Sequence, residues 1–178
     1  MKGKFRCSEF LFNLGVAQLI AQMVPRNWNV ETFIRESDPR HTVEIRRCYN
    51  RVNAWQPNLI LELHFNASNG QADYSLVLVG NPEIVTEASV FSLLLSTFLE
   101  TSRHDARVVT AGHRGYASVT AGKAKTFLCE PFFGDHAPTV ERLGNRAANL
   151  VAKAYVEALK QHFATTMYQT EINLLDKQ

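Results

Sequence analysis

Apolar residues alternate between helical spacing and short unbroken runs along the first half of the chain. Over residues 8–24 they recur every three or four positions, which predicts a helix capped by Ser8 and ended by Pro25. Residues 29–34 are predicted to form a short strand. Asp38 and Pro39 are typical of the cap and first turn of a polar helix that extends toward Trp55. Residues 59–65 form an apolar run typical of a buried strand.

The second half of the chain continues the same alternation. Strands are predicted at residues 74–79, 107–110 and 126–132, a helix after Pro82, and a long helix over residues 137–167. Residues 113–125 are rich in small residues and are expected to form a loop or a short helix. This order predicts an α/β fold: an open, mostly parallel sheet in three layers, with helices on both faces. The polar tail, residues 169–178, is expected to fray.

Length and composition are those of an ordinary globular chain. The 178 residues predict a single domain over residues 1–178, and the formal net charge of +2 without a basic cluster argues against a nucleic-acid partner. The three cysteines have no metal-type spacing and are expected to be buried reduced thiols. No signal peptide or membrane span is expected, so the chain is predicted to be cytoplasmic on synthesis.

Polar residues whose side chains could take part in catalysis or ligand binding occur where predicted strands end. His64 closes the run over residues 59–65, Asn66 follows it, and Glu130 lies near the end of a later run. Glu9 falls in the first turn of the first helix. Ligands of open α/β sheets gather at the carboxyl ends of strands, so these side chains are expected to meet there.

Each of these residues also has a purely structural interpretation. A structural hydrogen bond alone would explain His64, and a favourable charge at a helix N-terminus would explain Glu9. Glu130 lies between Cys129 and Pro131 among apolar neighbours, where an unpartnered carboxylate would be costly to bury. No Gly-rich phosphate loop follows a predicted strand, which argues against a nucleotide-binding domain.

Taken together, the histidine and the carboxylates point to metal-assisted hydrolysis. Histidine and glutamate are common zinc ligands, and a catalytic zinc keeps one position open for water. Bound zinc lowers the pKa of that water to about 7, which supplies hydroxide at neutral pH. A second carboxylate that does not bind the metal can take up the proton and pass it to a leaving amine.

Three segments carry a resemblance to a known family: SEFLFNLGVAQLIAQMV, RRCYNRVNAWQPNLILELHFNAS and TFLCEPFFG. They resemble the zinc-dependent N-acetylmuramoyl-L-alanine amidases of the AmiC type, which include phage endolysin domains. The resemblance runs from Ser8 to the final helix. It implies hydrolysis of the amide between N-acetylmuramic acid and L-alanine in peptidoglycan, by a chain expected to be a monomer. It also implies action on the cell wall after release or export by a separate system.

The resemblance also implies roles for individual residues. By motif, Glu9 and His64 match two ligands of a Zn²⁺ cofactor, and Glu130 matches the catalytic glutamate. Asn66 is expected to shape the site or contact substrate, or else to bond only the local turn.

One ligand of the family pattern has no counterpart here. The family's first ligand is a histidine of a Gly-His motif at the end of the first strand, yet the eight residues before Glu9 contain no histidine. The chain is therefore expected to be an N-terminally incomplete domain lacking that strand, or a degenerate relative. Otherwise His113 or His136 completes the site. The alternative function is a catalytically impaired module that binds peptidoglycan without hydrolysing it.

Overall fold

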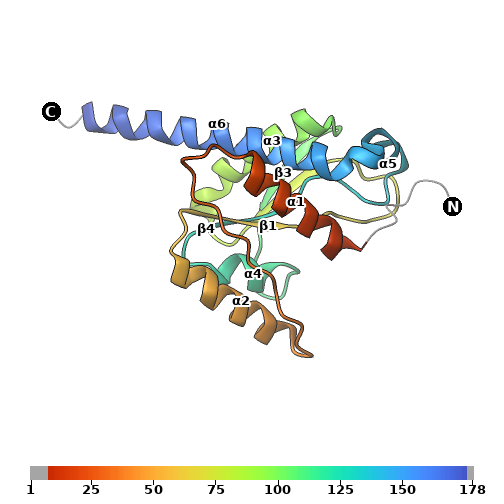
Figure 1. Ribbon diagram of the computed structural model, residues 1–178, viewed down its shortest axis with the longest axis horizontal. Helices are drawn as coiled ribbons and strands as arrows, with labels where there is room; N and C mark the ends of the chain where they lie inside the picture. The colour runs from red at the N-terminus through yellow and green to blue at the C-terminus, as the bar shows by residue number, and fades with distance from the viewer. Residues whose placement is uncertain (1–7, 176–178) are drawn as a thin grey trace.

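Four strands form one sheet with helices on both of its faces (Figure 1). The computed structural model describes the backbone of residues 8–175 and the side chains of residues 8–165. The strands are β1 (Leu59–Leu63), β2 (Ser75–Val79), β3 (His104–Val108) and β4 (Lys125–Glu130). The helices are α1 (Glu9–Met23), α2 (His41–Trp55), α3 (Val85–Leu99), α4 (Tyr116–Ala121), α5 (Ala137–Leu143) and α6 (Ala147–Leu175).

The sheet has the strand order β1-β4-β2-β3 and mixed direction. β1 pairs with β4 in parallel and β2 pairs with β3 in parallel, whereas β2 and β4 are antiparallel. The predicted α/β fold with a mostly parallel sheet is thus confirmed. Because β1 and β4 run in the same direction, with Leu63 opposite Cys129, their carboxyl ends lie next to each other.

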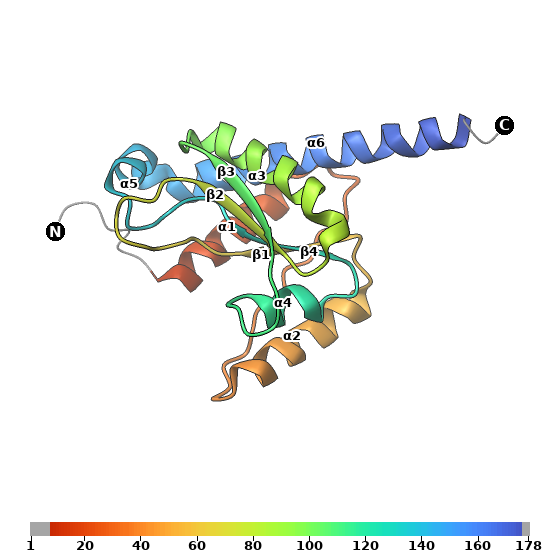
Figure 2. The ribbon, with the colours of Figure 1, turned by 180° about the vertical axis from the view of Figure 1, so that it is seen from behind.

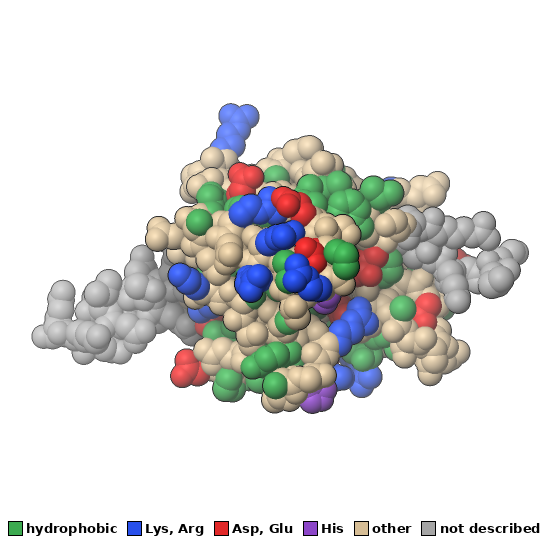
Figure 3. Space-filling model, turned by 90° about the horizontal axis from the view of Figure 1, so that it is seen from below, with side chains coloured by type: hydrophobic (Ala, Val, Ile, Leu, Met, Phe, Trp, Pro, Cys, Tyr) green, Lys and Arg blue, Asp and Glu red, His purple; other side chains and the backbone are tan. Residues whose placement is uncertain are grey.

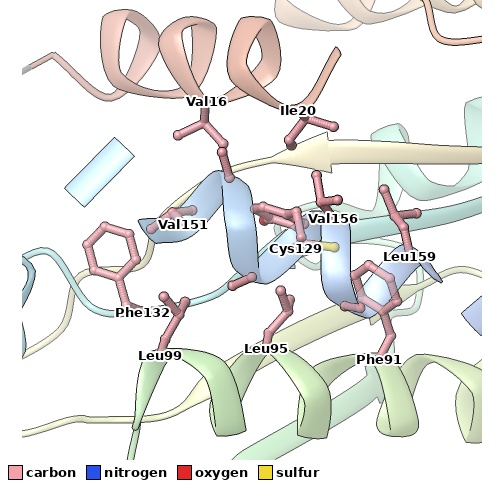
Figure 4. Packing of buried hydrophobic residues seen from close by; sticks show 14 of the residues in the cluster. Val16, Ile20, Phe91, Leu95, Leu99, Cys129, Phe132, Val151, Val156 and Leu159 are labelled. Atoms are coloured by element: carbon pink, nitrogen blue, oxygen red, sulfur yellow. The ribbon is translucent and has the colours of Figure 1, made fainter. Parts of the chain in front are cut away.

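Helices α1, α3 and α6 cover one face of the sheet, and α2 and α4 cover the other (Figure 1; Figure 2 shows the molecule from behind). On the first face, Val16 of α1, Leu95 of α3 and Val151 of α6 pack in one buried cluster with Phe127 and Cys129 of β4. Figure 4 shows side chains of this cluster pointing toward one another from the three helices. Cys48 and Cys129 are buried free thiols, as predicted, and Cys7 lies outside the described residues.

The second face carries two smaller apolar clusters. Ile60 of β1 packs against Ile45 and Val52 of α2, while Leu78 and Leu128 pack against Val119 of α4. Successive residues of a strand point to opposite faces. Ile60, Glu62 and His64 therefore share this face, as do Thr126, Leu128 and Glu130.

The first helix has the predicted extent, but its cap differs in one detail. Phe12, Val16 and Ile20 are buried at the predicted spacing, and Val24 is extended ahead of Pro25. Ser8 has the extended backbone of an N-cap, but its side chain makes no capping hydrogen bond.

Two predicted elements are wrong in part. Residues 29–34 form no strand: the segment pairs with none of the four described strands, and Val30 and Ile34 remain exposed. The predicted helix over residues 137–167 is divided into α5 and α6 at Gly144, whose φ of 53° interrupts the helical backbone. The backbone of α6 is helical as far as Leu175, and residues 176–178 of the predicted frayed tail lie outside the described residues.

One window, Pro82–Leu99, is long and apolar enough to cross a membrane by length and composition alone. It contains α3, whose Ala88, Phe91 and Leu95 are buried against the sheet and α6. Core helices of water-soluble proteins satisfy the same criterion, so this window is weak evidence for a span. The absence of a membrane span stays a prediction.

Candidate active site

The polar residues predicted from strand ends converge on one pocket. Glu9 enters from the first turn of α1, His64 directly follows β1, and Glu130 ends β4. All three line a pocket of about 210 Å³ on the face that carries α2 and α4. Figure 3 shows the molecule from this side, where basic and acidic side chains gather near the middle.

His64 is held between two carboxylates. Its Nδ1 atom lies 2.9 Å from Glu9 Oε1, and its Nε2 atom lies 3.2 Å from Glu62 Oε1. Glu9 Oε1 also accepts a hydrogen bond from the backbone N–H of Phe65 at 3.3 Å. The hydrogen bond from His64 lowers the pKa of Glu9 below its ordinary value, and this outweighs the opposing effect of partial burial. Glu9 is therefore a charged carboxylate near neutral pH.

Glu130 is in a different environment. Its side chain is only 5% exposed, and burial raises the pKa of Glu130 above its ordinary value, although the charge of Arg114 opposes this. Asn66 Nδ2 donates a hydrogen bond to Glu130 Oε2 at 2.6 Å, and Arg114 lies 3.8 Å from Oε1. A buried carboxylate with a raised pKa and a fixed orientation is suited to proton transfer.

The side chain of Asn66 bonds both to Glu130 and to the backbone beside it. Besides its bond to Glu130, its Oδ1 accepts from the backbone N–H of Ala67 at 2.9 Å. Its backbone also extends the pairing of the β1 and β4 segments, by bonds to Phe132 and Gly134. This pairing places the amide beside Glu130.

Four ionisable pocket residues were missed by reasoning from the sequence: Arg35, His41, Glu62 and Arg114. Glu62 could have been predicted from the sequence, because it lies two positions before His64 and strand alternation places both side chains on the same face of the sheet. Arg35 and Arg114 come from irregular segments whose position depends on the tertiary structure. Tyr49 of α2 lies next to Glu62 of β1, and its O–H donates a hydrogen bond to Glu62 Oε2 at 2.8 Å. Burial raises the pKa of Tyr49.

Neither histidine considered as a further ligand lines this pocket. His113 Nδ1 bonds to the exposed Thr110, and His136 Nδ1 bonds to Thr139 and lies 3.5 Å from Asp73. His41 lines the pocket instead, but its Nδ1 is directed at Glu44, 3.7 Å away on the same helix.

The donor atoms of Glu9 and His64 suit zinc, which favours histidine nitrogen and carboxylate oxygen. These two groups lie side by side at one end of the pocket, and a catalytic zinc site has three protein ligands. Within the described residues, no group of three His, Cys, Asp or Glu side chains is arranged to hold a metal ion. The described pocket therefore fits two of the three ligand positions.

Comparison with solved structures shows the same fold in several catalytic domains. The catalytic domain of the CD27L endolysin targeting Clostridia Difficile superposes with a TM-score of 0.67 at 22% identity, covering 90% of this chain and 88% of that one. The catalytic domain of CwlV, an N-acetylmuramoyl-L-alanine amidase from Bacillus (Paenibacillus) polymyxa var. colistinus, gives 0.67 at 14% identity, with 89% and 87% covered. Ami1 from Mycobacterium smegmatis gives 0.64 at 13% identity, with 93% and 81% covered.

Sequence comparison gives the family. No curated protein sequence matches the chain. The family described as N-acetylmuramoyl-L-alanine amidase matches residues 2–161, which include every residue of the pocket. The chain therefore belongs to the N-acetylmuramoyl-L-alanine amidase family.

Proposed function

We propose that this chain hydrolyses the amide between N-acetylmuramic acid and L-alanine in peptidoglycan by means of zinc-activated water. The observation that carries the proposal is the convergence of Glu9, His64 and Glu130, from three distant segments, on one pocket. Family membership supports the substrate class. Peptidoglycan lies outside the cytoplasm, so in this proposal a separate system releases or exports the chain.

Glu9 and His64 would hold the metal. The charged carboxylate of Glu9 and a ring nitrogen of His64 lie within 2.9 Å of each other, so a small movement apart opens a position between them. When bound, zinc would lower the pKa of a water molecule and polarise the carbonyl oxygen of the amide.

Glu130 would move the proton. As a carboxylate it accepts a proton from the attacking water, and as an acid it returns that proton to the departing amine of L-alanine. Its raised pKa makes the second transfer easier than it would be for an exposed glutamate. The bond from Asn66 holds Oε2 and so orients the carboxylate, while Oε1 lies 3.8 Å from the guanidinium of Arg114.

The test is the substitution Glu130→Gln, which keeps the shape of the side chain and removes the carboxylate that accepts the proton. We expect turnover of purified peptidoglycan to fall by about 10²–10⁴-fold, while zinc binding stays unchanged. Glu87→Gln is the matched control, because Glu87 pairs with Lys125 away from the pocket. Turnover in Glu130→Gln equal to that of the control would contradict the assignment.

A second candidate function is a module that binds peptidoglycan without cleaving it. It is favoured by one observation: the described residues supply two rather than three zinc ligands. Metal analysis separates the two candidates. One equivalent of zinc in the purified chain, lost in Glu9→Ala, supports the hydrolase, whereas a metal-free chain that still sediments with cell walls supports the binding module.

A further inference from the structure

We propose that this chain forms a symmetric homodimer in which β3 of one copy pairs antiparallel with β3 of a second copy, centred on Ala106. The proposal replaces the monomer expected from the family resemblance. It concerns the open edge of the sheet and does not depend on the proposed hydrolysis.

The first step is the open edge. β3 is the last strand in the order β1-β4-β2-β3, so no described strand lies beyond it (Figure 2). Its pairing with β2 continues at both ends. The N–H of Ser75 donates to the carbonyl oxygen of Arg103, and the N–H of Val109 donates to that of Val79. The odd-numbered residues of this segment therefore direct their backbone groups toward β2.

The even-numbered residues of β3, His104, Ala106 and Val108, direct their backbone groups outward, because these groups point to alternate sides along a strand. None of the described hydrogen bonds outside the β2–β3 pairing involves the N–H or C=O groups of these three residues. A row of unpaired backbone groups is a template for pairing with another chain.

The second step is the charge along this edge. Asp105 and Arg107 are two positions apart on β3, so both side chains lie on the same face of the sheet. The side chains are 37% and 53% exposed and form an ion pair of 2.6 Å within the chain. In a pairing centred on Ala106, Asp105 of each copy faces Arg107 of the other. Opposite charges that face each other across two strands stabilise the pair.

The third step is the register, which these charges select. Outward backbone groups meet only when even-numbered residues face each other, so the symmetric pairings differ by two-residue shifts. A shift in one direction places Asp105 opposite Asp105 of the second copy, and a shift in the other places Arg107 opposite Arg107. Like charges directly opposite each other are destabilising. Compared with either shift, the pairing centred on Ala106 brings opposite charges together and pairs more residues.

The other face of this edge agrees with the pairing. Ala106 lies on the face of the large apolar cluster and packs against it. Because its side chain is small, it leaves room for its equivalent on the second copy. Val108 is 37% exposed and faces His104 of the second copy in this register, so dimerisation covers apolar surface. The same patch serves both copies, as in most two-fold dimers.

The first experiment is sedimentation velocity of the purified chain over a range of protein concentrations. We expect a monomer–dimer equilibrium for the native chain. Ala106→Pro removes one outward N–H without removing a bond to β2, so it should abolish the dimer while circular dichroism stays native. A native chain that is monomeric at every concentration, or a dimer that survives in Ala106→Pro, would overturn the proposal.

The second experiment tests the charges and does not require β3 to accommodate a proline. Asp105→Arg leaves two positive charges on β3, and Arg107→Asp leaves two negative charges. Each variant alone should dimerise about tenfold more weakly than the native chain, because like charges then face each other at two positions. Mixed in equal amounts, the two variants should form a heterodimer, since every facing pair is then opposite in sign.

Association of this mixture reports contacts between chains, because neither variant keeps opposite charges at these two positions within its own chain. Arg46→Glu is the control: it changes an exposed arginine of α2, the helix that packs against β1 at the other edge of the sheet, and should dimerise as the native chain does. A mixture that stays monomeric, or single variants that dimerise like the control, would overturn the pairing through β3.

Discussion

Two carboxylates of the same pocket, Glu9 and Glu130, have pKa values shifted in opposite directions. The hydrogen bond from His64 lowers that of Glu9, whereas burial raises that of Glu130. Environments that separate the pKa values of two acids also separate their chemical roles. Glu9 suits a permanent negative ligand, and Glu130 suits a group that gains and loses a proton during the reaction.

The raised pKa of Glu130 predicts the pH dependence of turnover. Only the ionised form accepts a proton, so kcat/KM should fall as the pH drops through the pKa of Glu130, above the ordinary range of a glutamate. The charge of Arg114 lowers this pKa, so Arg114→Gln should move the acidic limb to higher pH. Arg114 is exposed, so the shift should be small and should shrink with added salt.

This prediction is checked with kcat/KM profiles of both chains at low and high ionic strength. An acidic limb that stays in place, or that moves to lower pH in Arg114→Gln, would show that Arg114 does not act on Glu130.

Asn66 gives a second prediction at the level of single residues. Asn66→Ala removes the 2.6 Å bond to Glu130 Oε2, so the carboxylate loses its fixed orientation. We expect kcat to fall by less than the about 10²–10⁴-fold that a general base contributes, because Glu130 itself remains, while zinc affinity is unchanged. Parallel kinetics and chelator competition check it. A loss of zinc affinity with unchanged kcat would place Asn66 in metal binding instead.

At the level of elements, the parallel pairing of β1 and β4 creates the site. It places the residue after β1 next to the last residue of β4, which is why His64 and Glu130 could be predicted to meet. The alternation of β1 also indicated which residues share a face. The partners of Glu62 could not be predicted, since Arg35 and Tyr49 reach it from separate segments whose placement depends on the assembled fold.

Gly122, which links α4 to β4, gives a prediction about these elements. A Cβ atom at this position would lie 2.8 Å from Ile60 Cδ1 and would overlap Thr126 Oγ1. Gly122→Ala should lower the free energy of unfolding by about 1–3 kcal/mol. Gly15→Ala is the control: it lies in α1 with nothing within 4 Å, and alanine should raise stability there by about 0.5–1 kcal/mol. Urea unfolding measures both, and equal effects would contradict this packing.

At the level of the whole molecule, one large apolar cluster holds the sheet to three helices, and the candidate pocket lies on the opposite face. The alternation of helices and strands was sufficient to predict this fold class. The strand order was not predicted, nor was the antiparallel direction of β2 against β4, because both depend on long-range pairing. The wrong strand at residues 29–34 has the same origin: its apolar pattern is suitable, but no neighbouring strand pairs with it.

The core predicts an asymmetry within α3. Leu95 is fully buried between the sheet and α6, whereas Leu93 is 45% exposed. Leu95→Ala should lower the free energy of unfolding by about 2–5 kcal/mol, and Leu93→Ala should change it much less. Thermal and urea unfolding of the two variants test this. Equal destabilisation by both would contradict the packing of α3 on the sheet.

The most direct test of the central claim is the identity of the bond that is cut. Purified peptidoglycan is incubated with the zinc-loaded chain, and newly formed amino termini are labelled and identified. The account predicts new N-terminal L-alanine without new reducing sugar ends. With Glu130→Gln it predicts no new N-terminal L-alanine. New reducing ends, amino termini other than alanine, or unchanged peptidoglycan despite bound zinc would contradict it.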